Sequence, residues 1–164
     1  MSKKDDFLVE LKRESASTRK MLERVPMDKL AWRPHPKSNS LEQLAKHIAN
    51  LPNMLIHAIT VDEHNVMGVP PLPPLESTEQ LLGWFDDNIA KAIAAYADFT
   101  DDLLDRKWEL KAGDRVYIST TKQDAMRYLY FNHTYHHRGQ MSVYLRLLDV
   151  PVPGMYGPTA DEPM

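Results

Sequence analysis

Apolar residues recur at steps of three and four positions along most of the chain, which is the period of an amphipathic α-helix. We predict four helices from this pattern. The first ends near Val25, because Pro26 follows and disfavours helical geometry in the residue before it. The buried face of this helix is expected to contain Leu8, Leu11, Ser15, Thr18, Leu22 and Val25.

Two serines mark the starts of the second and third helices. Ser40 with Gln43, and Ser77 with Gln80, have the spacing of a capping box, in which the two side chains satisfy free backbone N–H groups. The second helix carries a proline, Pro52, inside its apolar pattern. We therefore expect this helix to bend there.

Two stretches between the helices have a different character. Residues 68–74 contain four prolines and one glycine, which predicts an extended linker long enough to cross a helical bundle. Residues 108–110 and 116–118 flank a turn-forming segment at Gly113. We interpret these residues as a small hairpin or irregular excursion before the fourth helix.

The fourth helix should begin at a cap formed by Thr120 and Gln123 and run to about Leu148. Four helices in a chain of 164 residues predict an all-α fold, namely a four-helix bundle. The length is that of one domain, so we expect residues 1–164 to form a single unit.

Charge and composition remove several classes of function. The 20 basic and 23 acidic residues give a net charge of −3, which argues against a nucleic-acid partner. The chain has no cysteine and therefore no disulfide, thiolate ligand or cysteine nucleophile. It shows neither the apolar core of a signal peptide nor a membrane-spanning stretch. We expect a cytoplasmic protein without a membrane partner.

Two histidines in the fourth helix are the strongest chemical signal. His133 and His137 are one helical turn apart, within about 40° of each other around the axis. A histidine pair at this spacing forms the helical half of many zinc sites but needs a further ligand. It is equally typical of two buried structural histidines. The pair is expected to face the bundle interior together with Met126, Leu129, Gln140, Tyr144 and Leu147.

His47 is the best candidate for a third ligand, because it lies on the apolar face of the second helix. Three imidazole nitrogens with an open fourth position are typical of catalytic rather than structural zinc, and nickel suits the same ligands. Candidates to orient the histidine rings through hydrogen bonds are Asn50, Gln140 and Tyr144.

The other histidines are not expected to bind metal. His136 leaves the fourth helix well to the side of the pair, and His57 lies about 80° from the apolar face of the second helix. His64 and His35 belong to polar or proline-rich segments that favour the surface. Well-known catalytic motifs are also missing: the residue after His133 is threonine, which excludes a zinc-peptidase helix, and no Gly-x-Ser-x-Gly occurs.

The arrangement of these residues resembles the DinB-like (damage-inducible) family of bacterial metal-binding four-helix bundles, within the bacillithiol-transferase-like superfamily. The resemblance rests on Ser40-x3-Leu44-x2-His47, on the string from His133 to Gln140 with its His-x3-His-Arg-Gly-Gln pattern, on the tail from Arg146 to Glu162, and on Trp32-Arg33-Pro34.

This resemblance implies up-down-down-up connectivity, a zinc or nickel ion on His47, His133 and His137, and frequent homodimers. We expect a homodimer here also because Tyr128 and Tyr135 lie off the inward face of the fourth helix. Some relatives are metal-dependent transferases that use low-molecular-weight thiols such as bacillithiol. Another branch isomerises maleylpyruvate with mycothiol and usually carries an extra C-terminal domain, so we do not expect that activity for residues 1–164.

Three functions therefore stay open for the sequence. The first is a metal-dependent S-transferase that takes a low-molecular-weight thiol and a second small-molecule substrate. The second is metal-dependent hydrolysis, and the third is a metal-binding stress-response protein without turnover. The same three ligands serve all of them.

Overall fold

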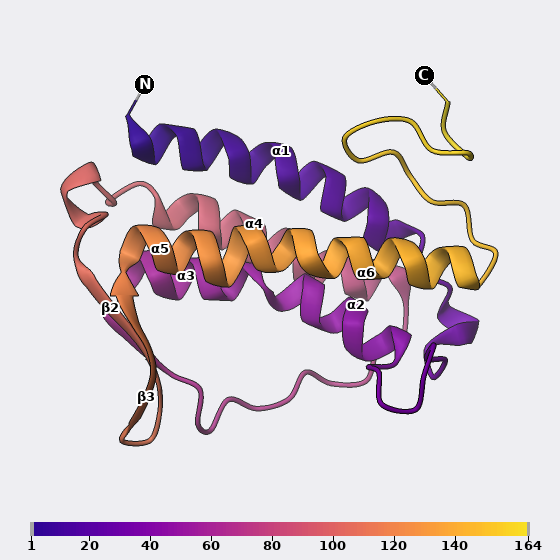
Figure 1. Cartoon of the computed structure of the whole chain (residues 1–164), viewed down its shortest axis with the longest axis horizontal. Coiled ribbons are helices and arrows are strands. Elements are labelled where there is room, and N and C mark those ends of the chain that lie inside the picture. The colour runs from indigo at the N-terminus through magenta and orange to yellow at the C-terminus, as the bar shows by residue number, and fades with distance from the viewer. Residues whose placement is uncertain (1, 164) are drawn as a thin grey trace.

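Long helical segments make up the body of the protein in the computed structural model, which describes residues 2–163 (Figure 1). The segments are α1 (Lys3–Glu23), α2 (Leu41–Asn50) with α3 (Pro52–Thr60), α4 (Thr78–Ala95), and α5 (Lys122–Met126) continued by the π-helical turn η3 (Arg127–Asn132) into α6 (His133–Leu147). Short 3₁₀ turns lie at η1 (Met27–Lys29) and η2 (Asp101–Leu103).

The direction of the helices follows the up-down-down-up pattern. In Figure 1, α1 and the α5–α6 segment run one way, and α2–α3 and α4 run the other way. The proline-rich linker explains how two successive segments can be parallel, because it travels back along the whole bundle before α4 begins. The predicted helical bundle is therefore observed in its main features.

The predicted helix starts are largely observed. Ser40 and Gln43 form a complete capping box, with hydrogen bonds of 3.2 and 2.8 Å. Ser77 accepts a hydrogen bond from the backbone of Gln80, whose own side chain turns to Glu76 instead. The bend expected in the second helix is a break, since α2 ends at Asn50 and α3 begins with proline at its first position.

A small sheet departs from the all-α prediction. The excursion is a hairpin of β2 (Lys107–Ala112) and β3 (Arg115–Thr121), which turns at Gly113 with a positive φ of 58°. A third strand, β1 (Glu63–Asn65), adds in parallel beside β2. The residues of β1 are all polar and do not alternate with apolar ones, so the sequence did not predict this strand. Backbone hydrogen bonds hold it, such as that from the Val66 amide to the Lys111 carbonyl at 2.9 Å.

The fourth helical segment differs from prediction at its start and in its phase. Its cap is Thr121, whose side chain accepts from the amide of Asp124 at 3.2 Å, rather than Thr120. The π-helical turn η3 then interrupts the uniform α-helical spacing. As a result Leu147, expected to face inward, is 58% exposed. The prediction assumed the same α-helical rotation per residue along the whole segment, and this assumption was wrong.

The buried face of α1 is also shifted from the predicted one. Leu11, Thr18 and Leu22 are buried as expected, but Glu14 is buried with them and Ser15 is not. Packing of α1 against α4 and α6 therefore places a carboxylate inside the bundle. Within residues 2–163, no helix combines the length and the apolar composition that a membrane crossing requires.

Candidate metal centre

The three histidines singled out by the sequence meet between α2 and α6. Nε2 of His47 lies 3.3 Å from Nε2 of His133, and the ring centroids of the three residues are 4.5–5.0 Å apart. Each ring offers one nitrogen within 4.8 Å of the others. All three side chains are half-buried, so the cluster lies at the edge of the apolar core.

Local structure explains why these side chains converge. His47 lies one residue before the buried Ile48 on α2, so its ring is at the margin of the face that packs on α6. His133 is the first residue of α6, directly after the π-helical turn, and His137 follows one α-helical turn later. The buried stripe of α6 runs beside the pair rather than through it, and consists of Thr134, Arg138, Met141, Tyr144 and Leu145.

The spacing of the nitrogens fits a small divalent cation. Zinc binds histidine nitrogen at about 2.0–2.1 Å in tetrahedral sites, which places two such nitrogens about 3.3–3.4 Å from each other. The 3.3 Å separation of the His47 and His133 nitrogens matches this value. The three histidines therefore form a group that could hold a metal ion.

A hydrogen bond orients one of the rings. Nδ1 of His137 lies 2.7 Å from Oε1 of Gln140. This contact leaves Nε2 of His137 free to face the centre. Of the three side chains expected to orient the rings, Gln140 alone does so among the described residues.

Asn50 and Tyr144 have other partners. The side chain of Asn50 accepts a hydrogen bond of 2.6 Å from Asn53, where α2 gives way to α3. The hydroxyl of Tyr144 donates to the carbonyl of Asn39 at 3.1 Å, and its ring packs edge-on against Trp32. Both were expected beside the histidines because they lie at suitable helical positions, but closer polar groups on neighbouring segments bind them.

The pKa values of all three histidines in the cluster are lowered, which favours their neutral form. Burial, followed by the proximity of His137 and His133, lowers the pKa of His47 to about 4. Burial is also the largest cause that lowers the pKa of His133 and of His137. Neutral imidazole is the form that binds metal, so all three rings hold the required lone pair at neutral pH.

The sequence and the fold of this chain both resemble those of known proteins. The sequence matches the model of the DinB family over residues 1–163. The chain belongs to the DinB family. A DinB-like protein from Bacillus cereus ATCC 10987 has the same fold, with a TM-score of 0.73 and 24% identity over 93% of this chain and 97% of its own. A DinB-like protein from Bacillus subtilis gives a TM-score of 0.69 and 19% identity over 97% and 99%. A search among curated proteins found no significant match.

The remaining histidines of this DinB family protein lie outside the cluster. His136 is exposed, and His35 is an exposed loop residue whose Nδ1 accepts from the amide of Lys37 at 3.1 Å. His57 and His64 stack on each other with centroids 3.9 Å apart, so that His64 is half-buried in β1 rather than free on the surface. That none of these four binds metal stays a prediction.

Stability of the metal-free DinB protein should fall as the pH drops from about 6.5 toward 4. The unfolded chain protonates His47 near its ordinary pKa of 6.5, whereas the folded chain resists until about pH 4, so protons favour unfolding in this interval. Urea unfolding in the presence of a chelator, repeated across this interval, measures the slope. His47→Gln should flatten the curve and His35→Gln should not. Parallel curves for all three proteins would contradict the assignment.

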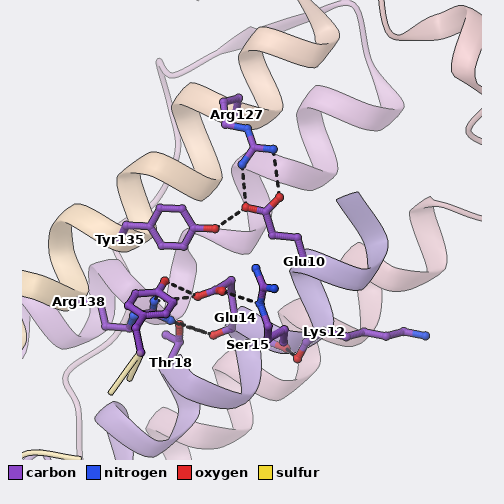
Figure 2. A network of polar contacts seen from close by, with 10 residues as sticks. Glu10, Lys12, Glu14, Ser15, Thr18, Arg127, Tyr135 and Arg138 are labelled. Carbon is purple, nitrogen blue, oxygen red and sulfur yellow. Dashed lines mark hydrogen bonds and ion pairs between the residues drawn. The ribbon is translucent and has the colours of Figure 1, made fainter. Parts of the chain in front are cut away.

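A network of charged and polar groups joins α1 to α6 (Figure 2). Glu10 accepts two hydrogen bonds from Arg127, at 2.7 and 3.0 Å, and one from the hydroxyl of Tyr135. Glu14 pairs with Arg138 at 2.8 Å, and both residues are almost fully buried. The network therefore fixes the rotation of α6 from the α1 side.

The C-terminal tail completes this network. The hydroxyl of Tyr156 donates to Glu14 at 2.7 Å and accepts from Arg138. Burial acts to raise the pKa of Glu14, but the hydrogen bonds from Tyr156, Arg138 and Arg13 outweigh it and lower the pKa overall. The carboxylate thus stays charged inside the bundle.

Sequence reasoning missed this network because charged residues on an amphipathic helix usually face solvent. The signal available was the position of Glu14 on the apolar arc of α1, between Leu11 and Thr18. Tyr135 was interpreted as an outward residue that supports dimerisation. Its ring is half-buried and its hydroxyl binds Glu10, so it gives that idea no support.

Proposed function

We propose that His47, His133 and His137 bind one divalent cation, zinc or nickel, and that the protein is a metal-dependent transferase acting with a low-molecular-weight thiol. The observation that carries this proposal is the convergence of three neutral nitrogens without a fourth side-chain ligand in the group that the described residues form. Such a ligand set leaves a coordination position open for a reactant.

The chemistry of the chain itself favours a thiol taken from solution. When bound, a divalent cation lowers the pKa of a thiol that occupies its open position. The chain has no cysteine, so the sulfur nucleophile has to come from a small molecule. Gln140 supports this role by holding the ring of His137 in place.

Metal binding should stabilise the folded protein, because the unfolded chain lacks the converged site. Zinc or nickel at about 100 times its Kd should raise the free energy of unfolding by about 2.7 kcal/mol, or the melting temperature by about 5–10 °C. Thermal unfolding with and without a chelator measures this shift. His133→Ala should abolish it, whereas His35→Ala should keep it. A wild-type melting curve insensitive to added metal would refute the site.

The thiol role is tested by turnover of the metal-loaded protein with cysteine and chlorodinitrobenzene. In this reaction the thiol sulfur forms a bond to the ring carbon, chloride leaves with the bonding electrons, and the thiol proton passes to solvent. We expect the product to form faster with wild-type protein than with His133→Ala. Metal-dependent ester hydrolysis without thiol transfer would favour the hydrolase, and neither activity would favour a protein without turnover.

We also propose a homodimer that forms through the C-terminal half of α6. Gly139, Val143 and Leu147 follow one another at four-residue spacing, and the two apolar side chains are 55% and 58% exposed. Added Cβ atoms at Gly139 would meet nothing within 4 Å, so another helix could approach closely there. Sedimentation should show a dimer at micromolar concentration. Val143→Lys with Leu147→Lys should give a monomer, and Val9→Lys on α1 should not.

A further inference from the structure

The π-helical turn creates a pocket beside the histidine cluster. Its volume is about 290 Å³, near the lower end of the range for sites that hold small molecules. Its lining residues recur every four positions along the outer side of η3 and the start of α6. The pocket is lined by Tyr128, Leu129, Asn132, His133 and His136. Because His133 belongs to the lining, a molecule in the pocket would touch one of the three proposed metal ligands.

The chemistry of this lining is selective. Among the described residues, the lining includes no aspartate, glutamate, lysine or arginine. It combines an aromatic ring, an aliphatic side chain, one carboxamide and two imidazoles. Without a bound metal, a fully charged ligand therefore finds no ionised side chain in this lining to offset the hydration that it loses. An uncharged ligand with a planar face meets aromatic surface and one hydrogen-bonding amide.

Tyr128 contributes an exposed aromatic ring to the pocket. Its side chain is 63% exposed, although tyrosine rings usually bury much of their apolar surface. Leu129, the next residue, is almost buried and provides the floor of the pocket. The exposed tyrosine ring and the buried leucine together supply apolar surface to the pocket.

We propose that this pocket binds the second substrate of the protein, and that this substrate is a small uncharged molecule with a planar aromatic or conjugated electrophilic group. The inference rests on the proposed function, because it assigns the electrophile that a thiol at the histidine cluster would attack. Tyr128 stacks on the planar group, Asn132 binds its polar substituent, and the pocket orients its reacting carbon toward the side of His133.

The binding test uses two unreactive probes of the same shape, neutral meta-dinitrobenzene and anionic dinitrobenzoate. Backbone amide NMR resonances are followed at pH 8, with and without zinc. We expect the neutral probe to shift the resonances of Tyr128, Asn132 and His136, and the anionic probe to bind at least about five-fold more weakly. Shifts confined to Ile118 and Ala125, in the neighbouring pocket that shares Tyr128, would overturn the assignment. Equal binding of the two probes would overturn the proposed selectivity.

Matched variants separate this inference from the function on which it rests. Tyr128→Ala should weaken the neutral probe by about five-fold, the value of one good aromatic contact. Tyr117→Ala removes a comparably exposed tyrosine, 55% exposed on β3 and outside the pocket, and should change nothing. Probe binding without any metal binding would refute the metal centre and keep the pocket. Metal binding with no probe in the pocket would refute the pocket alone.

Discussion

Replacing Arg138 with methionine should lower the free energy of unfolding by about 3–5 kcal/mol. The substitution keeps an unbranched side chain of similar length but removes the buried guanidinium, which leaves the Glu14 carboxylate with only Tyr156 and the exposed Arg13 as partners. Removing one member of a buried ion pair is among the most destabilising changes a mutation makes. Both side chains are at most 3% exposed, so water cannot replace the lost ion pair. Urea unfolding monitored by circular dichroism gives the change directly.

Two further variants show whether the charge or the packing is responsible. Glu14→Leu combined with Arg138→Met removes both charges, and should recover most of the lost stability because a buried ion pair contributes little beyond an apolar pair. Arg19→Met breaks an ion pair with Asp86 in which both side chains are 40% or more exposed, and should change stability by less than about 1 kcal/mol. A double variant as unstable as Arg138→Met alone would show that packing, not charge, is at work.

Replacing Lys122 with methionine should lower the free energy of unfolding by about 3 kcal/mol. The ammonium group of Lys122, almost fully buried, donates to the carbonyls of Ala58, Ile59 and Val61 at the end of α3. Methionine would leave these acceptors unpaired, and each buried unpaired group costs about 1–3 kcal/mol where water cannot reach it. The loss should appear in urea unfolding at neutral pH.

The control for this prediction is Lys107→Met. Lys122 pairs with the Asp62 carboxylate at 3.3 Å, and Lys107 likewise pairs with Glu109, but the Lys107 side chain is 71% exposed. Its replacement should change stability by less than about 1 kcal/mol. A similar loss in both variants would mean that the carbonyls of α3 are hydrated once Lys122 is gone, and the proposed capping role would be wrong.

The helical framework could be predicted because apolar periodicity and capping residues act locally. Ser40 with Gln43, and the break at Pro52, are visible from neighbouring residues alone. The π-helical turn cannot be predicted from neighbouring residues in this way. Met126 and Leu129 fit an ordinary α-helix as well as the observed one. Long-range packing of the segment decides between the two, which is why the exposure of Leu147 could not be predicted.

The histidine cluster could be anticipated from the sequence because His133 and His137 lie one helical turn apart on the same helix. His47 could be anticipated because it lies on the apolar face of another helix. By contrast, the ion pair of Glu14 with Arg138 joins residues 124 positions apart, and β1 depends on backbone pairing with a strand more than 40 residues later. Local patterns contain no information about such partners, so both features emerge only from the folded chain.

The network on α1 has a consequence for protein synthesis. Glu14 is made early, yet two of its hydrogen-bond donors are made late. Arg138 and Tyr156, 124 and 142 positions further along the chain, both donate to its Oε2. While the ribosome is still adding the intervening segments, α1 has to keep Glu14 hydrated and cannot settle into its final place. The buried, hydrogen-bonded setting of Glu14 can therefore be completed only after nearly the whole chain has been made.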